Sequence, residues 1–252
     1  MMLKLNFNKI ITVTLLSLIC MVSLSISRAY AQETMTIDAP TDDSSVFEAR
    51  PDLNRGGADY LYVGVGVYTS GYPARTWVKF GLSSIPDGVV ITKAELRLHF
   101  ESIVSYGNGA PGGMGVHFSS DDTWEETVIT WNNQPSFEST PTFTVSEGKY
   151  DGWVSFDVTS DVISEYSGDG VVSWCLCAVN EEGGGKNFNT ADSDECSQTY
   201  GPYLYIEYQP APEQVIPVVP FGTATIIALA VLAFGTMALL SKRNSLRHIT
   251  SH

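Results

Sequence analysis

Hydrophobic and polar residues alternate with a period of two in several stretches of the chain between residues 32 and 209. The clearest stretch is 93–100, where Ala, Leu, Leu and Phe alternate with Lys, Glu, Arg and His. Successive side chains of an extended strand point to opposite faces. The stretch therefore predicts a half-buried antiparallel strand with one apolar and one charged face.

Further stretches of this kind are separated by Gly, Pro, Asp and Asn, which is typical of short strands joined by turns. They lie at 61–68, 75–80, 153–159, 172–176 and 202–208. Residues 160–166 alone have helical spacing, enough for one or two turns. With no internal repeat or linker, the pattern predicts an all-β fold, a single jelly-roll-like antiparallel β-sandwich over residues 32–209.

The N-terminal 31 residues have the pattern of a secretory signal peptide. A basic start is followed by an apolar run over 10–26 and by Ala29-Tyr30-Ala31, which fits the small-x-small rule for signal peptidase. We expect cleavage after Ala31, which makes residues 1–31 a signal peptide. The alternative is an uncleaved anchor helix.

The C-terminal end predicts a membrane helix. Residues 221–241 carry no charge, and about 20 such residues span the hydrocarbon core of a bilayer. Lys242 and Arg243 follow, so the positive-inside rule places the basic tail, 242–252, in the cytoplasm and the body outside. Residues 210–220 form a proline-rich spacer. The three parts also resemble the C-terminal sorting signals of prokaryotic, especially archaeal, surface proteins, in which the helix is removed; a permanent anchor is the alternative.

Charge is distributed very unevenly along the chain. The formal net charge is −14, but the segment 33–213 holds all 28 acidic residues and only 8 basic ones, a formal charge of −20. A surface this acidic repels phosphate backbones and anionic lipid headgroups. The composition therefore argues against nucleic-acid binding and fits a solvated extracellular domain.

Three cysteines remain after loss of the signal peptide: Cys175, Cys177 and Cys196. Cys175 and Cys177 share one face of a predicted strand, where extended geometry keeps their Cβ atoms too far apart for a bond. Either of them is able to pair with Cys196, and we take Cys177 and Cys196 as the candidate disulfide. No His or second Cys-x-x-Cys lies nearby in the sequence, which disfavours a zinc site.

Sugar binding needs flat aromatic rings and fixed polar groups, and a charged glycan also needs cations. Several such side chains alternate with the apolar set and so face away from the core. These candidates are Tyr62, Tyr68, Arg75, Trp77, Lys79, Arg97 and His99. Since basic residues are rare in the body, their gathering here favours an acidic glycan such as a uronate polymer. The alternative is a solvated face or a face covered by a second sheet.

The segment 121–135 offers other chemistry. Trp124 and Trp131 are either a sugar platform or, as the surrounding Thr, Asn and Pro residues favour, anchors of a long connection. Carboxylates gather at Asp121, Asp122, Glu125 and Glu126. This favours a structural calcium site, with Asp121, Asp122 and Glu125 as candidate ligands, over the acid and nucleophile of a glycosidase. No nucleophile motif accompanies the body's histidines, so we expect no catalytic residues and no other cofactor.

A set of short motifs in the body resembles the DNRLRE domain family, which is grouped with carbohydrate-binding module family 96 and with repeats related to archaeal disaggregatase. The motifs are, in order, Asp43-Ser44-Ser45-Val46, Pro51-Asp52-Leu53-Asn54 with Gly56, Leu61-Tyr62-Val63-Gly64, Arg75 with residues 79–86, Ala94-Glu95-Leu96-Arg97-Leu98, residues 124–135, residues 153–159, and Pro202-Tyr203-Leu204. Two sites depart from the family pattern: Gly81, where members usually carry Asp, and Thr190-Ala191-Asp192, where they usually carry Arg-Glu.

The resemblance implies a β-sandwich that binds polysaccharide on exported proteins without catalysis. Together with the two ends, it predicts a carbohydrate-binding module at the surface of an archaeal or bacterial cell, anchored by the C-terminal helix with the domain outside. The alternatives are a structural or adhesive surface protein and, third, a disaggregatase-like enzyme that cleaves polysaccharide.

Overall fold

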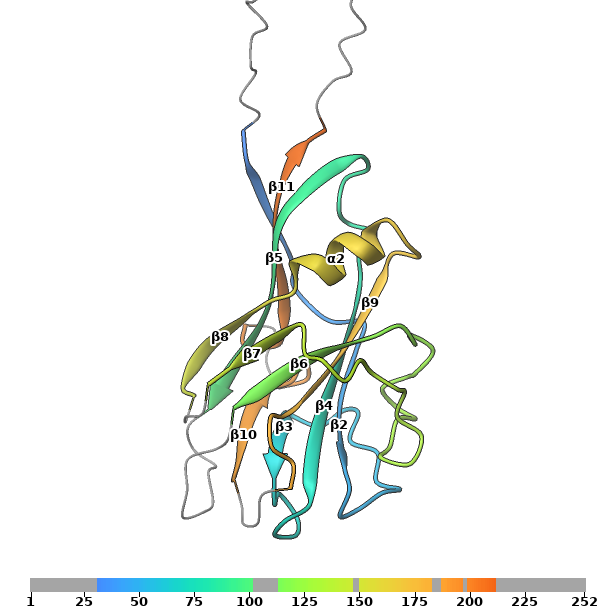
Figure 1. The fold of residues 1–252 in the computed structure, drawn as a ribbon, viewed down its shortest axis with the longest axis vertical. Coiled ribbons are helices and arrows are strands. Elements are labelled where there is room, and N and C mark those ends of the chain that lie inside the picture. The colour runs from blue at the N-terminus through green and yellow to red at the C-terminus, as the bar shows by residue number, and fades with distance from the viewer. Residues whose placement is uncertain (1–30, 102–112, 147–149, 183–186, 197–198, 212–252) are drawn as a thin grey trace, which may run out of the picture. The chain divides into compact units, whose positions relative to one another are not determined.

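A computed structural model describes residues 31–101, 113–146, 150–182, 187–196 and 199–211 of the chain (Figure 1). The strands are β1 (Glu33–Ile37), β2 (Asp42–Phe47), β3 (Tyr60–Val65), β4 (Pro73–Gly81), β5 (Val89–Glu101), β6 (Met114–Ser119), β7 (Phe143–Val145), β8 (Gly152–Asp157), β9 (Val171–Ala178), β10 (Asn187–Asp192) and β11 (Tyr203–Pro210). One helix, α2 (Thr159–Tyr166), lies between β8 and β9.

The strands form one curled sheet in which every described pairing is antiparallel. Their order is β1-β11-β5-β10-β3-β4-β9-β6-β7, while β2 pairs with β4 and β8 pairs with β5. The strand β10 pairs with both β5 and β3, and so connects the β1-β11-β5-β8 half to the β2-β4-β9-β6-β7 half. The predicted all-β class is confirmed.

The larger of two hydrophobic clusters in the described residues joins the two halves. Leu96 and Leu98 of β5 belong to the same buried cluster as Phe80 of β4 and Trp174 of β9. Each apolar side chain of this size contributes about 1.5–3 kcal/mol by leaving water. Because the two halves bury their apolar faces against each other, the sheet is curled as in a β-sandwich.

The strand β4 is buried on both faces, unlike the half-buried strand that its alternation predicts. Its outer face carries a second cluster, in which Trp77 packs with Trp124 and Ile129 of the segment between β6 and β7. The Trp124 indole N–H donates to Ser173 Oγ of β9 at 3.2 Å. Trp124 is therefore an anchor that fastens this long segment to the sheet.

The helix α2 lies where the spacing predicts it and packs against β5 and β9 (Figure 1). It buries Val162, and its Asp161 accepts hydrogen bonds from the Trp174 indole at 2.8 Å and the Thr142 hydroxyl at 2.7 Å. These bonds satisfy the polar atom of a buried tryptophan, which would otherwise cost free energy.

The two ends of the chain lie almost entirely outside the described residues. This applies to the predicted signal peptide (1–31), spacer (210–220), membrane helix (221–241) and tail (242–252), of which only Ala31, Pro210 and Ala211 are described. In the ranges given above, α2 is far too short to cross a bilayer and no helix qualifies as a membrane span.

The predicted disulfide between Cys177 and Cys196 is wrong, since Cys175, Cys177 and Cys196 are all free thiols. Cys177 is buried on β9, where hydrogen bonding with Cys175 and His117 lowers the pKa of its thiol. Cys196 follows β10 and lies beside Asp192. The two thiols therefore have different neighbours, which sequence spacing does not reveal.

Candidate functional site

Rings gather on the outer face of β8, β5 and β11. Trp153 is paired with His99, and Tyr203 is paired with Arg97. Since the alternate residues Leu96, Leu98 and Phe156 enter the core, these side chains must point outward. We call the rings of Trp153, His99, Tyr200, Tyr203 and Tyr205 the aromatic face.

The rings of the aromatic face contact one another. Trp153 lies edge-on to His99 at 5.3 Å and to Tyr203 at 4.9 Å between ring centroids. The ring of Tyr200 lies over His99 at 4.5 Å. Trp153 is 42% exposed and Tyr200 is 46% exposed. Such mutual packing holds the rings in fixed orientations while it leaves large apolar surfaces open to solvent.

An ion-pair group borders the rings. The Arg97 guanidinium lies 4.3 Å from the Tyr205 ring centroid, and it donates to Glu95 Oε2 at 2.6 and 3.0 Å and to Tyr203 Oη at 3.0 Å. Lys93 Nζ lies 2.7 Å from the other oxygen of Glu95. Burial works against ionisation of Glu95, but hydrogen bonds from Lys93 and Arg97 outweigh it and lower the pKa of this carboxyl.

His99 is oriented by a buried carboxylate. Its Nδ1 lies 2.8 Å from Oδ2 of Asp192, which is buried at the end of β10. An ionised carboxylate only accepts hydrogen bonds, so we assign the proton to Nδ1. In the neutral ring the Nε2 atom is then an acceptor, which suits a sugar hydroxyl.

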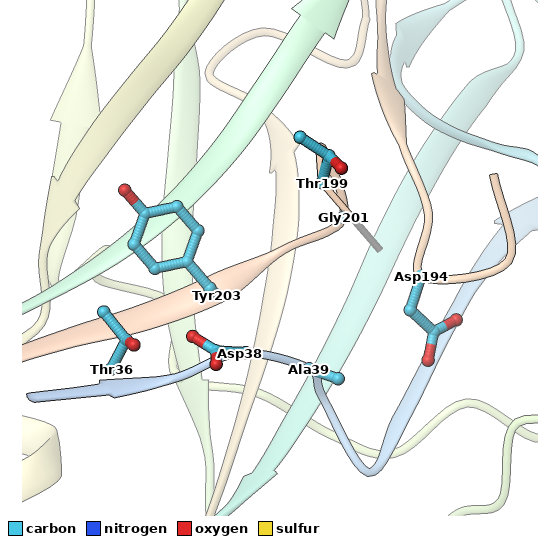
Figure 2. A pocket seen from close by; sticks show the side chains of 7 residues that line it. All are labelled: Thr36, Asp38, Ala39, Asp194, Thr199, Gly201 and Tyr203. Atoms are coloured by element: carbon cyan, nitrogen blue, oxygen red, sulfur yellow. The ribbon is translucent and has the colours of Figure 1, made fainter. Parts of the chain in front are cut away.

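A cavity of about 640 Å³ adjoins the aromatic face at Tyr203 (Figure 2). Its lining residues are Thr36, Asp38, Ala39, Asp194, Thr199, Gly201 and Tyr203. Figure 2 shows Thr36 and Asp38 beside Tyr203, with Asp194 farther along on another segment. Hydroxyl and carboxylate groups beside a ring are the combination that sugar hydroxyls require.

The candidates on β4 are not available at the surface. Trp77 is fully buried and Lys79 is nearly so, because the segment that Trp124 anchors covers this face. Lys79 pairs with Asp42 at 2.8 Å. Arg75 is enclosed by the rings of Trp131 and Phe137 and binds Glu181 at 2.7 and 2.9 Å. These side chains hold the segment between β6 and β7 against β4, and this segment, which is a loop, covers the face.

Tyr62 and Tyr68 form a separate group. Both rings lie against Phe47 of β2, and Tyr68 also lies under the Arg50 guanidinium at 4.2 Å. They are only partly exposed. The structure thus divides the seven candidates among three places, and only Arg97 and His99 belong to the aromatic face.

The predicted calcium ligands do not converge. Asp121 Oδ1 caps a turn by accepting from the backbone and hydroxyl of Thr123, and Glu125 is exposed. Burial raises the pKa of Asp122, and Lys79 lies near it. In the part of the chain that the structure describes, one other acidic group does converge: Asp43, Glu126, Asp194 and Glu195.

Burial and like-charge repulsion shift the pKa values of this acidic group. Burial, followed by contact with Glu195, raises the pKa of Glu126 to about 7 and that of Asp194 to about 6. The pKa of Asp43 is also raised, chiefly by burial. Hydrogen bonds with Asp194 and Glu126 overcome the effect of burial on Glu195 and lower its pKa. The environment therefore disfavours ionisation of all four carboxyl groups at the same time.

Sequence reasoning missed Trp153, Tyr200, Tyr203 and Tyr205. Alternation could have predicted that three of them point outward. Trp153 precedes the inward Val154, and Tyr203 and Tyr205 alternate with the apolar residues 204 and 206. Tyr200 lies between β10 and β11, outside any alternating pattern, so only tertiary structure places it near His99.

A curled antiparallel sheet with outward-facing rings gathered on one face is the arrangement of a carbohydrate-binding module of the β-sandwich class. The chain belongs to carbohydrate-binding module family 96, whose sequence profile matches residues 34–208. The match begins in β1 and ends in β11, so it includes all or most of each described strand. Comparison with curated proteins finds no match.

Proposed function

We propose that this protein binds polysaccharide noncovalently through the aromatic face, without cleaving it. The observation that carries the proposal is the cluster of Trp153, Tyr200 and His99, with two of its rings more than two-fifths exposed. The apolar side of a pyranose ring stacks on such surfaces, and burial of apolar area contributes about 25 cal/mol per Å². The cavity beside Tyr203 supplies polar groups for hydroxyls of the same chain.

Glu95 influences whether the aromatic face prefers a neutral or an acidic glycan. Arg97 and Lys93 are the cations of this face, and both already have Glu95 as a carboxylate partner. An acidic glycan, as the sequence favours, must therefore compete with Glu95 for these cations. We expect the face to bind a neutral chain without this cost, and a uronate chain more tightly once Glu95 is neutralised.

The test is retention of the full chain by immobilised neutral and uronate polysaccharides. Trp153→Ala and Tyr200→Ala should each abolish most retention, since they remove the stacking surfaces. Tyr72→Ala is the matched control, because Tyr72 is as exposed as Tyr200 (46%) but lies in the β3–β4 connection. Equal retention of all these variants would exclude the aromatic face as the binding site.

The variant Glu95→Gln tests whether Glu95 competes with an acidic glycan. Greater retention of this variant on the uronate polymer, with unchanged retention on the neutral one, supports competition by Glu95. If the unaltered chain already prefers the uronate polymer and Glu95→Gln has no effect, the ion pairs do not oppose an acidic ligand and the acidic-glycan expectation stands.

The setting we propose is the prokaryotic cell surface, with the domain exported and anchored by the C-terminal residues 221–241. The apolar, uncharged sequence of these residues and the basic residues after them support this proposal. Many weak sites on one surface bind a polymer far more tightly than one site does. Failure of every glycan to bind, with cross-linking on cells to protein neighbours, would favour the structural or adhesive role instead.

Catalysis is tested separately, by assay of new reducing ends after incubation with surface polysaccharide. We expect none. Cleavage that is lost in Glu125→Gln or Glu126→Gln would establish the enzymatic alternative.

A further inference from the structure

Four carboxylates from three separate segments meet at one place outside the aromatic face. Asp43 lies in β2, Glu126 lies between β6 and β7, and Asp194 and Glu195 follow β10. One oxygen from each of the four lies within 4.8 Å of the others. In the described ranges, none of the ion pairs of the protein includes any of these four residues.

The Asp43 side chain and one oxygen of Asp194 are buried without a partner outside the group. Asp43 is 1% exposed, and its side chain accepts one hydrogen bond in the described part of the chain, from the backbone N–H of Asp194 at 3.2 Å. Asp194 Oδ1 is inaccessible to solvent and accepts no hydrogen bond from any described residue. Buried polar oxygens are almost always satisfied, and buried charges are paired or bind a metal.

The backbone around Glu126 is held in place by contacts outside the acidic group. Asn54 Nδ2 donates to the carbonyl oxygens of Glu126 and Ile129 at 2.7 and 2.8 Å. The Glu126 N–H donates to Asp42 Oδ1 at 2.9 Å. Gly56 permits this packing, since a Cβ there would lie 2.3 Å from the Glu126 carbonyl oxygen. The position of Glu126 among the other carboxylates is therefore built into the fold.

We propose that Asp43, Glu126, Asp194 and Glu195 bind a divalent cation of the calcium class. Calcium takes six to eight oxygen ligands in flexible geometry, and carboxylates on loops supply them. Magnesium demands a near-ideal octahedron and keeps several waters, which suits this group less well. The cation occupies the point where these negative charges converge, and it gives a partner to the unpaired Oδ1 of Asp194 and to the buried carboxylate of Asp43.

The site joins the segment that Trp124 anchors to the stretch of chain that leads to Tyr200. Glu126 belongs to the segment that Trp124 anchors, while Asp194 and Glu195 precede Tyr200 and the strand of Tyr203. Asp194 also lines the cavity that ends at Tyr203 (Figure 2). A bound cation thus fixes Asp194 and Glu195, which precede Tyr200 in the chain. It does so whether or not a glycan is bound.

The test is titration of the full chain, freed of metal with a chelator, with calcium chloride or magnesium chloride. We expect calorimetry to show that one calcium ion binds, with a dissociation constant of about 1 mM or tighter, as in extracellular modules. Calcium should also raise the unfolding temperature, because it binds the folded state alone. Magnesium should bind at least about tenfold more weakly, since its geometry is stricter.

Asp194→Asn and Glu126→Gln should weaken calcium binding about tenfold or more, because each removes a charged ligand. Asp121→Asn is the matched control: it changes a neighbouring acid that lies outside the group, and its amide oxygen still accepts from Thr123. No calcium response in the unaltered chain, or the same response in Asp194→Asn, would overturn the proposal. A loss in Asp121→Asn alone would place the calcium elsewhere and overturn it too. No glycan is needed, so failure here is distinct from failure of polysaccharide binding.

Discussion

The guanidinium of Arg97 lies 4.3 Å from the centroid of the Tyr205 ring, across neighbouring strands β5 and β11. Glu95, two residues before Arg97, binds the same guanidinium. The aromatic and ionic parts of the candidate site are therefore one unit, because the cation belongs to both.

Arg97→Ala should weaken polysaccharide binding without unfolding the domain. The side chain is 27% exposed, so its cation–π contact and ion pair together contribute only about 1 kcal/mol to stability. Loss of its hydrogen bonds to a glycan should cost ~1–2 kcal/mol, or about tenfold in affinity. Affinity and thermal unfolding are measured on the same sample, with Arg97→Lys as the control. A large fall in unfolding temperature would assign Arg97 a structural role.

Glu95 should make stability depend on pH in the acid range. Its pKa is lowered in the folded state, because hydrogen bonds from Lys93 and Arg97 outweigh burial. Its stabilising contribution is therefore present above the unfolded pKa, about 4.3, and is lost as pH falls through the lower folded pKa. The difference in unfolding free energy between the native chain and Glu95→Gln should shrink over that range. A difference that is constant from pH 7 to pH 3 would contradict the assignment.

Trp124→Ala and Trp153→Ala should have opposite effects. Trp124 is buried against Trp77 and bonded to Ser173, so its removal should cost about 3–5 kcal/mol of unfolding free energy. Trp153 is 42% exposed, so its removal should cost far less stability but most of the glycan affinity. Chemical denaturation and glycan retention measure the two quantities. The reverse outcome would mean that Trp124 is the sugar platform.

Gly56→Ala should be strongly destabilising for a surface-loop substitution. A Cβ at this position would lie 2.3 Å from the Glu126 carbonyl oxygen and 2.7 Å from its carbonyl carbon, and backbone atoms cannot move as easily as a side-chain end. Gly71→Ala is the comparison, because a Cβ at this position meets no atom within 4 Å while the residue has a positive φ of 84°. We expect only Gly56→Ala to disturb calcium binding, measured by calorimetry.

The free thiols should differ in reactivity. Burial and contact with Asp192 raise the pKa of Cys196 to about 11. Because the thiolate is the reactive form, alkylation of Cys196 in the folded protein should speed up about tenfold per pH unit between pH 7 and 9. Peptide mass analysis without reductant locates the reacted sites. Recovery of a linked Cys177–Cys196 peptide would restore the predicted disulfide.

Much of the fold could be read from local patterns. Period-two alternation in 93–100 predicted both the strand β5 and its inward face. This was possible because the pleat of a strand alone determines which side chains share a face. The helix at 160–166 was equally local. Alternation did not show that Trp77 and Lys79 are covered, because their covering segment lies more than forty residues away in sequence.

The sequence by itself determined the class of the protein: alternation produced an all-β domain, the motifs placed it in its family, and the excess of acid set its surface charge. Tertiary structure alone decided which outward residues form a site. Tyr200 reaches His99, and Asp194 reaches Asp43, through the return of the chain after β10. The physical reason is that side-chain direction follows from a few neighbouring residues, whereas the meeting of distant segments depends on how the sheet curls around its core.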